Sequence, residues 1–361
     1  MAKSTKGRMT AKSEGAGWGE FELLRRLTEA PGVPGREERI REIVLEETRG
    51  MWDETRVDNM GNLICTKRAA KGRGTSPRVM LACHMDEIGF YVRFIEESGH
   101  LRVVNVGGFD TRNLFARRVL VQGRKDLVGV MNPAGRPVHM ASDEEKRKIP
   151  EVREFVVDLF LPRARVAELV EIGDPVTLLQ TTEQVGDAIC GKAMDNRVAL
   201  WTAIHALRKV GDKSRYDVHF VACVQEEVGL RGAGTAAFSV EPDIGIAIDT
   251  TLCCDTPGIS RDDAVTTFGG GVGIKVLDGA SISHRGLFDE FVKVARAKKI
   301  KHQLEVLPRG GTDAGAVQRA RGGSRAITLS VPTRYIHTVT EAIHRDDARA
   351  AVNLLAAWLT A

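Results

Sequence analysis

From residue 194 to the C-terminus, apolar stretches alternate with amphipathic stretches, and this alternation constrains the fold more than any other feature. The apolar stretches are typical of buried strands, and the amphipathic stretches repeat their apolar side chains at helical spacing. We predict strands at 218–225, 244–249 and 326–332 and helices at 194–210, 288–299 and 345–360. Such alternation favours an α/β fold, in which a mostly parallel sheet is flanked by helices on both faces.

The stretch from 90 to 185 has a different pattern. Short strand-like segments with glycine turns dominate it, and one helix-like segment occurs at 164–172. Helical and strand-like segments precede this stretch, at 21–30, 36–47 and 78–85. We therefore predict a β-rich domain at 90–185, inserted into a discontinuous α/β domain made of 19–89 and 186–361.

Composition and charge exclude several classes of function. No stretch approaches the roughly 18 consecutive apolar residues of a membrane helix. The net charge of +4 comes mostly from residues 1–16, so no broad basic surface for nucleic acid is expected. Residues 1–18 lack the apolar core of a secretion signal, and we interpret them as a disordered tail. Six cysteines without CxxC spacing favour reduced thiols and a cytoplasmic protein.

Ionisable side chains collect where the predicted strands end. Ligands of open α/β sheets bind beyond the carboxyl ends of the strands, so a functional site is expected at these positions. The candidate residues are His84 and Asp86 after the first buried strand, Asp195 in the turn into the 194–210 helix, Glu226 and Glu227, Asp249, and His337 in the last loop.

Two imidazoles combined with several carboxylates suit a divalent transition metal, above all zinc. One catalytic zinc with three protein ligands would use only part of this set, whereas two ions sharing a carboxylate would use most of it. A water between two such ions becomes hydroxide near neutral pH and can attack a carbonyl carbon. A further carboxylate must accept the proton, and the adjacent Glu226 and Glu227 can divide the tasks of base and ligand.

Each residue also has an ordinary structural interpretation. An HxD sequence is commonly a hydrogen-bonded pair, and two neighbouring glutamates are commonly solvated. Asp195 could cap its helix, Asp249 could end its strand in an Asx turn, and His337 could satisfy a loop carbonyl. The loop at 310–315 could cap a helix or line a site. The shared location of these residues at the ends of apolar strands favours the metal site.

The chain resembles the glutamyl aminopeptidase or tetrahedral aminopeptidase family, whose members are peptidases with two co-catalytic metal ions. The similarity covers about residues 20–361 in order, and no metal or base position departs from the family pattern. The motifs that carry it are CHMDEIGF (83–90), GKAMDNR (191–197), QEEVGLRGA (225–233), IAIDTT (246–251), DTPG (255–258), GGTDAG (310–315) and RYIHTVTE (334–341).

The resemblance implies a ligand set for two divalent ions per chain. One ion would be held by His84 and Glu227. The other ion would be held by Asp249 and His337, and Asp195 would bridge the two. Zinc is the expected metal, with cobalt and manganese as alternatives.

The resemblance also implies roles for the remaining residues and for the insertion. Glu226 would be the general base, and Asp86 would orient the ring of His84, as metal-bound imidazoles usually require. The inserted β-rich domain would mediate dimerisation. Dimers would then assemble into a hollow tetrahedral dodecamer.

The expected activity is therefore that of a metal-dependent aminopeptidase, which removes N-terminal residues from peptides. One alternative is another amide hydrolysis on the same scaffold, by a deacylase or a carboxypeptidase. A second alternative is an endoglucanase-type glycoside hydrolase, although that chemistry uses two carboxyls and no metal. A third is a non-catalytic assembly protein with a decayed site, which the complete ligand set disfavours.

Overall fold

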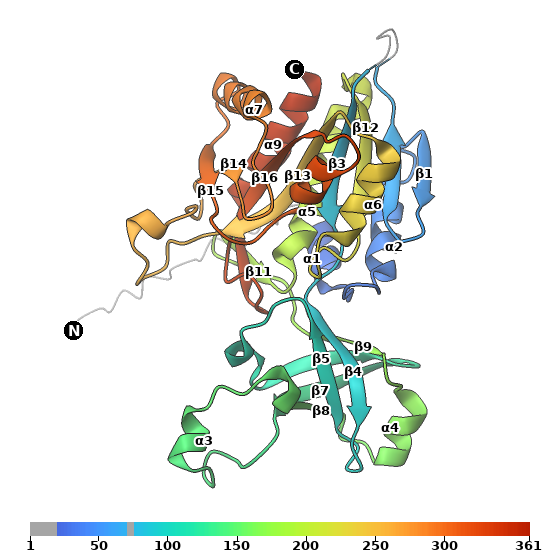
Figure 1. Ribbon diagram of the computed structural model, residues 1–361, viewed down its shortest axis with the longest axis vertical. Coiled ribbons are helices and arrows are strands. Elements are labelled where there is room, and N and C mark those ends of the chain that lie inside the picture. Colours follow the sequence, from blue (N-terminus) through green and yellow to red (C-terminus); the bar gives the residue numbers. More distant parts are fainter. Residues whose placement is uncertain (1–19, 71–75) are drawn as a thin grey trace, which may run out of the picture.

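The computed structural model describes residues 20–70 and 76–361. Its larger part is a mixed α/β unit in which a long sheet is covered by helices, and its smaller part is a β-barrel (Figure 1). The tail predicted at 1–18 lies outside the described residues. Among the helices that are described, none has the length and apolarity that crossing a membrane requires.

The centre of the large sheet is parallel, and its flanks are not. Four neighbouring parallel strands form the centre: β12 (Asp217–Cys223), β3 (Arg78–His84), β13 (Ile244–Leu252) and β16 (Arg325–Arg334). The flanking strands are β1 (Glu54–Val57), β2 (Leu63–Lys67), β10 (Glu183–Val185), β11 (Ala188–Gly191), β14 (Val272–Leu277), β15 (His302–Val306) and β17 (Glu341–His344).

The flanking strands join the sheet through antiparallel pairs, and only β14 and β15 among them pair in parallel. Short turns connect β1 to β2 and β10 to β11, and such turns permit only antiparallel neighbours. The prediction of a mostly parallel sheet is therefore right for the centre, and the sheet as a whole is mixed.

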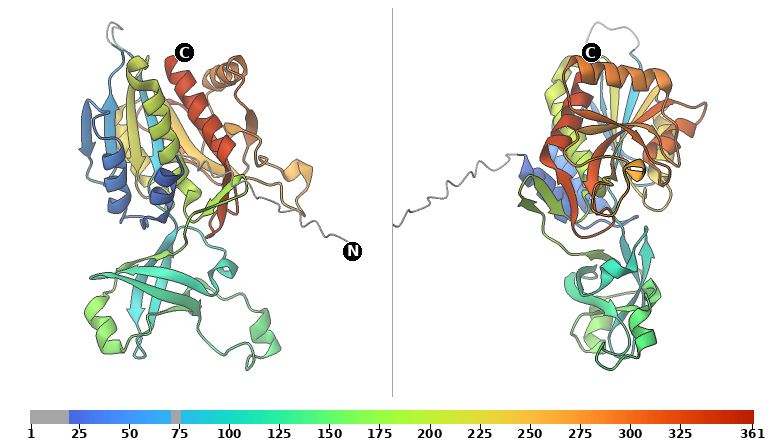
Figure 2. Two further views of the ribbon diagram at one scale, coloured as in Figure 1. Left: turned by 180° about the vertical axis from the view of Figure 1, so that it is seen from behind. Right: turned by 90° about the vertical axis from the view of Figure 1, so that its left-hand side faces the viewer.

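Helices cover both faces of this sheet (Figure 2). One face carries α1 (Phe21–Glu29), α2 (Glu38–Glu47), α5 (Met194–Val210), α7 (Arg285–Ala297) and α9 (Arg345–Thr360). The other carries α6 (Arg231–Val240) and α8 (Asp313–Arg319). In β3, Val79, Leu81 and Cys83 enter the first core, whereas Met80 and Ala82 enter the second. Successive strand side chains point to opposite faces, so a continuous apolar run serves both cores.

Six antiparallel strands form the closed barrel: β4 (Gly89–Ile95), β5 (Leu101–Val106), β6 (Arg117–Gln122), β7 (Asp126–Pro133), β8 (Phe155–Asp158) and β9 (Pro175–Leu178). Its core is aliphatic and aromatic, and closure leaves no free strand edge. Two short helices accompany the barrel, α3 (Asp143–Arg147) and α4 (Arg163–Leu169).

The chain enters the barrel directly after the central strand β3 and returns to the large sheet through β10 and β11. β10 pairs with β11 of the large sheet, so the last three residues of the stretch 90–185 belong to that sheet and not to the barrel. The barrel therefore lies beside the carboxyl end of the central strands (Figure 1).

Candidate active site

The central strands end at the same edge of the sheet. His84, the last residue of β3, lies opposite Cys223, the last residue of β12. Asp249 lies in β13, two residues beyond its last position paired with β3. Parallel strands present their carboxyl ends together, so the residues that follow them converge. The side chains that line one cavity here include all six predicted metal or base residues: His84, Asp195, Glu226, Glu227, Asp249 and His337.

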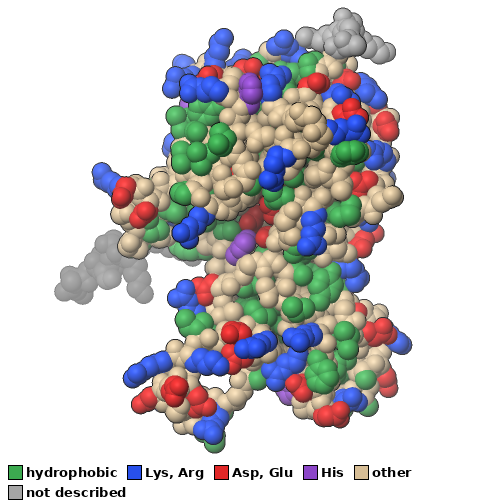
Figure 3. All heavy atoms as spheres, viewed as in Figure 1, with side chains coloured by type: hydrophobic (Ala, Val, Ile, Leu, Met, Phe, Trp, Pro, Cys, Tyr) green, Lys and Arg blue, Asp and Glu red, His purple; other side chains and the backbone are tan. Residues whose placement is uncertain are grey.

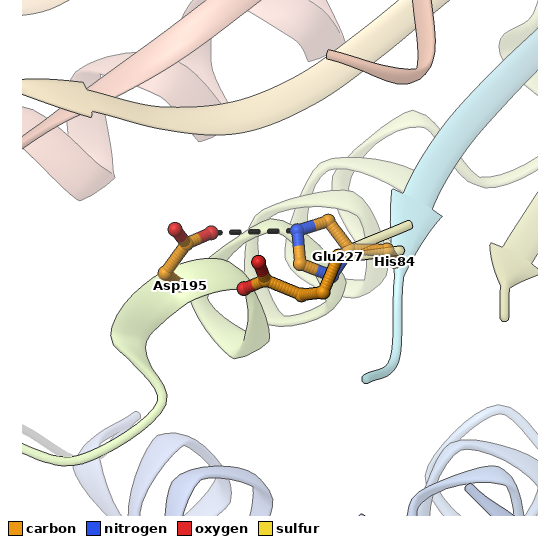
Figure 4. Close-up of side chains that lie close together, drawn as sticks. All are labelled: His84, Asp195 and Glu227. Atoms are coloured by element: carbon orange, nitrogen blue, oxygen red, sulfur yellow. Dashed lines mark ion pairs between the residues drawn. The ribbon is translucent and has the colours of Figure 1, made fainter. Parts of the chain in front are cut away.

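His84 is the centre of the first group of contacts and is almost fully buried. Its Nε2 lies 3.3 Å from Oδ1 of Asp195, and Figure 4 shows these two side chains facing each other beside Glu227. The same nitrogen lies 3.8 Å from Oε2 of Glu226 and 3.9 Å from Oδ1 of Asp249. One ring nitrogen is therefore close to three carboxylates.

His337 is the centre of the second group. Its Nε2 lies 3.5 Å from Oδ2 of Asp195 and 3.4 Å from Oε2 of Glu227. Asp195 thus directs one oxygen to each imidazole, which is the geometry expected of a shared ligand.

These contacts add a second grouping of the ligands to the one that the resemblance implies, since His84, Asp195 and Glu227 also offer ligand atoms within 4.8 Å of one another. The implied grouping joined Glu227 to His84 and Asp249 to His337. In the structure Glu227 contacts His337, and Asp249 contacts His84. Asp249 comes beside His84 because β13 is a direct parallel neighbour of β3.

Asp86 acts through two different groups. Its backbone carbonyl accepts a hydrogen bond from Nδ1 of His84 at 3.0 Å, whereas its carboxylate lies 3.6 Å from that nitrogen. The two carboxylate oxygens accept the backbone N–H groups of Glu226 and Glu227, each at 3.0 Å. Asp86 therefore directs Nε2 of His84 toward the other ligands and also holds the turn that carries both glutamates.

The start of α5 is irregular where it delivers Asp195. Asp195 and Asn196 depart from helical backbone angles, and the peptide bond between them is cis. The side chain of Asn196 donates a hydrogen bond to the carbonyl of Ile248 in β13, at 2.9 Å. The carboxylate of Asp195 faces the two imidazoles and does not cap the helix.

Glu341, the last residue of the RYIHTVTE motif, has no role predicted from the sequence. This buried carboxylate accepts the backbone N–H of Asp195 at 2.9 Å and that of His337 at 2.8 Å. The available signal was weak, since a glutamate four residues after a histidine at the start of a strand has no distinctive pattern. Its contact with Asp195 joins residues that are 146 positions apart in the sequence, so only the folded chain reveals it.

A buried ion cluster behind the site was also missed. Nζ of Lys192 lies 2.8 and 2.7 Å from the two carboxylate oxygens of Glu87, and Arg197 reaches the same carboxylate at 3.4 Å. Arg197 also donates to the backbone carbonyls of Leu27 and Ala30. The cluster joins the loop after β3 to α5, and each buried charge has an opposite partner.

The pKa values indicate a surplus of negative charge in the site. Burial raises the pKa of Glu226, Glu227 and Asp249, and repulsion between the carboxylates adds to this. Burial alone would lower the pKa of both histidines. Contacts with the carboxylates outweigh it, so the pKa of His84 is raised and that of His337 rises to about 11. A cation bound here would relieve this repulsion.

The residues fit divalent metal ions. Two overlapping groups each offer one nitrogen and two oxygen atoms within 4.8 Å of one another: His84, Asp195 and Glu227, and His84, Glu226 and Asp249. Imidazole nitrogen and carboxylate oxygen are the donors that zinc and related ions accept. Buried carboxylates without balancing positive charge are unfavourable, and two dications would balance the four carboxylates.

The cluster lies in a cavity of about 470 Å³, a size that accommodates a small molecule or a few side chains. Figure 3 shows acidic atoms deep in a hollow near the junction of the α/β unit and the barrel. Gly310, Gly311 and Thr312 line this cavity, as one of the two interpretations of the loop 310–315 predicted. Thr312 stands at the N-cap position of α8, but its side chain makes no capping hydrogen bond and contacts Asp278 and Thr328 instead. The apolar lining residues are Leu230, Leu252, Leu307 and Ile336.

The family profile of the M42 glutamyl aminopeptidases matches residues 61–354. A protein of Acetivibrio thermocellus assigned as an aminopeptidase is 37% identical over 336 residues, which are 93% of this chain and 97% of the relative. The lysyl aminopeptidase of Pyrococcus furiosus is 32% identical, with 94% and 96% covered. The glutamyl aminopeptidase of Lactococcus lactis is 30% identical, again with 94% and 96% covered.

Solved structures of an aminopeptidase and of a peptidase have the same fold as this chain. An aminopeptidase of the archaeon Desulfurococcus kamchatkensis superposes with a TM-score of 0.89 at 34% identity, over 94% of both chains. The TET1 peptidase of Pyrococcus horikoshii, which can assemble into a tetrahedron or a large octahedral shell, superposes with a TM-score of 0.84 at 31% identity, over 94% of this chain and 99% of its own. By its profile match, its relatives and its fold, the chain belongs to the M42 glutamyl aminopeptidase family.

Proposed function

We propose that this protein is a metal-dependent aminopeptidase that removes single N-terminal residues from peptides. Membership of the M42 family supports the activity. The observation that carries the proposal is Asp195, whose two oxygens lie 3.3 Å from one imidazole and 3.5 Å from the other. A carboxylate in this position can be shared by two ions.

The contacts support a specific distribution of ligands. His84 and Asp249 would hold one divalent ion, Glu227 and His337 would hold the other, and Asp195 would belong to both. Zinc is the proposed metal, with cobalt and manganese as alternatives. When bound, such ions polarise a carbonyl group and lower the pKa of a coordinated water.

Glu226 is proposed as the general base. It lines the cavity beside the ligands and is nearly buried, and this burial raises the pKa of its carboxyl group above the ordinary value. A raised pKa suits a group that must first accept a proton and later release it. Glu226 would accept a proton from the attacking water and deliver it to the nitrogen of the departing amine. Asp86 would support this step by holding the backbone of Glu226.

The surroundings of the site favour the free end of a peptide. Carboxylates in the cavity can accept hydrogen bonds from an α-amino group, and the apolar wall can contact one adjacent side chain. An acetylated N-terminus would lose its charge and add bulk at the same place. The substrates are therefore proposed to be unblocked peptides.

The barrel is proposed as an assembly domain, within the inserted span 90–185, and the catalytic domain as 19–89 with 186–361. Large apolar side chains are exposed on the barrel, among them Phe94, Val128 and Phe160. Such side chains are suited to burial between subunits. The chains would form dimers, and the dimers would assemble into a dodecamer. The tetrahedral assembly of the TET1 peptidase supports this by analogy. The protein is proposed to be cytoplasmic. Light scattering on the intact protein should give a multiple of two chains, and a fully active monomer would contradict this.

The activity is tested by mass spectrometry during digestion of one peptide in free and N-acetylated forms. We expect stepwise loss of single residues from the free form and little or no cleavage of the acetylated form. Internal fragments as the first products would show an endopeptidase. Equal rates on the two forms would instead support a deacylase or another amide hydrolase.

A further inference from the structure

We propose that Glu341 is a positioning residue that sets the distance between Asp195 and His337, and thereby controls the affinity of one of the two metal positions. The inference rests on the proposed metal centre. It concerns a side chain that would bind no ion itself. The affected position is the one formed by Asp195, Glu227 and His337.

The hydrogen bonds of Glu341 are the first observation. Its Oε2 accepts the backbone N–H of Asp195 at 2.9 Å, and its Oε1 accepts the backbone N–H of His337 at 2.8 Å. One rigid carboxylate therefore joins the backbones of two proposed ligands. A glutamine could not replace it, because its amide nitrogen would meet one of these N–H groups as a second donor.

The second observation is that Glu341 is itself held firmly. It is 2% exposed, and β17 places its backbone opposite Gly191 of β11. Gly191 lies four residues before Asp195, so the strand pair and the carboxylate hold the same segment. Close packing explains the glycine, since a Cβ there would lie 2.3 Å from Oγ1 of Thr182.

The third observation is the backbone of the histidine loop. His337 has a φ of 64° and Tyr335 a φ of 60°, in the left-handed region that residues with side chains rarely adopt. A loop in this conformation needs fixed hydrogen bonds to hold its imidazole in one place. Glu341 supplies such a bond directly to His337.

Glu341 does not line the large cavity but lies behind it. It borders a narrow space of about 10 Å³, shared with Asp195, Glu227 and His337, which is room for one water at most. A peptide in the large cavity would therefore not contact Glu341. Its influence would pass through the ligands it holds, and the position formed by His84 and Asp249 would be affected less.

The chain offers a matched control in Asp347. This carboxylate is also buried, and it accepts two backbone N–H groups, from Gly269 and Gly271, each at 2.7 Å. None of these three residues lines the large cavity. Asp347→Asn therefore removes the same kind of clamp without touching a proposed ligand.

The test compares metal-free wild type, Glu341→Gln, Glu341→Asp and Asp347→Asn by titration with Co²⁺. The visible absorption of cobalt reports ligand geometry, and competition with a chelator reports affinity. We expect Glu341→Gln to bind one of two ions at least tenfold more weakly, with a changed spectrum. Glu341→Asp should be intermediate, and Asp347→Asn should bind both ions as wild type does while losing thermal stability.

The possible failures are distinguishable. If Glu341→Gln binds both ions with the affinity and spectrum of wild type, the proposal is overturned. If Glu341→Gln does not fold, wild-type affinity and a wild-type spectrum in Glu341→Asp overturn the proposal. If wild type itself binds fewer than two ions, the proposed metal centre fails, and this failure is seen before any variant is compared.

Discussion

The barrel and the α/β unit bury very different side chains. Between residues 89 and 178, all described in the structure, the buried polar side chains are Gln122 and Thr177, and no charged side chain is buried. Buried charged or histidine side chains of the α/β unit include Glu37, His84, Asp86, Glu87, Lys192, Arg197, Asp249, Lys275, Glu305, Asp313, Glu341 and Asp347.

The buried side chains therefore have different consequences for stability in the two units. Apolar burial stabilises the barrel at a rate of roughly 25 cal/mol per Å². Buried charge opposes stability unless it is paired or hydrogen-bonded. Buried ionisable groups gather at functional sites, so their concentration in the α/β unit indicates that the active site belongs to this unit. The two interiors meet at Val339, which follows His337 in the same loop and packs into the barrel core.

The largest expected effect comes from the charged interior. Glu226→Gln should lower kcat by about 10²–10⁴-fold, because the amide cannot accept a proton at neutral pH. Its stability should not fall, since burying the charge of Glu226 is unfavourable. Enzyme kinetics, thermal unfolding and elemental analysis check this together.

Glu227→Gln is the matched control for that variant. It should lose metal occupancy first, because Glu227 contacts His337 as a proposed ligand. Turnover of Glu226→Gln within a few-fold of wild type would remove the assignment of the base. Loss of an ion from Glu226→Gln would make Glu226 a ligand instead.

A substitution in the apolar interior of the barrel should lower stability and leave metal affinity unchanged. Phe155 is fully buried in the barrel core, where it meets the edge of Phe115 with ring centroids 5.6 Å apart. Phe155→Ala should lower the free energy of unfolding by about 3–5 kcal/mol, the usual cost of such a cavity. Metal affinity at a temperature where the variant is folded should equal that of wild type. A marked loss of affinity would show that barrel packing controls the site.

The contribution of the buried Glu37 carboxyl group to the stability of the fold should depend on pH. Its Oε1 accepts the N–H groups of Gly35 and Gln225, and burial, with repulsion from Asp86, raises its pKa to about 7. The folded pKa lies above the unfolded value of 4.5, so this stability contribution is complete below about pH 4.5 and is lost as pH rises through 7. The loss amounts to about 3 kcal/mol, at roughly 1.4 kcal/mol for each unit of the pKa difference.

Glu37→Gln isolates that contribution, because Oε1 of glutamine can keep both hydrogen bonds. The variant should gain stability relative to wild type as pH rises from about 4.5 to 8. Urea unfolding midpoints of both proteins across this pH range measure the difference. Parallel pH profiles would show that Glu37 titrates normally in the folded state.

The smallest effect is expected at an exposed contact between the two parts. Arg39 of α2 makes two hydrogen bonds of 2.7 Å to Asp126 of β7. Both side chains are more than 40% exposed, so Arg39→Ala should cost less than about 1 kcal/mol, and less still in high salt. Urea unfolding at two salt concentrations checks this. A loss of several kcal/mol would mean that this pair fixes the barrel to the α/β unit.

Much of the molecule was predictable because local patterns decided it. The apolar runs that became β3, β12, β13 and β16 are long enough to indicate buried strands, and their carboxyl ends indicated where a site would form. The change to short segments with glycine turns indicated a separate β-rich region. The mixed character of the sheet was missed, because flanking strands such as β10 and β17 are only three or four residues long.

The sequence by itself determined which residues are candidates for the site, because their types and their places after apolar strands are local properties. Only the tertiary structure decided which of them touch. Asp249 lies beside His84 because β13 and β3 are neighbours, and Glu341 reaches Asp195 because β17 pairs with β11. Such contacts depend on how distant segments are ordered in the sheet and on where loop side chains point, and no local pattern of residues encodes either.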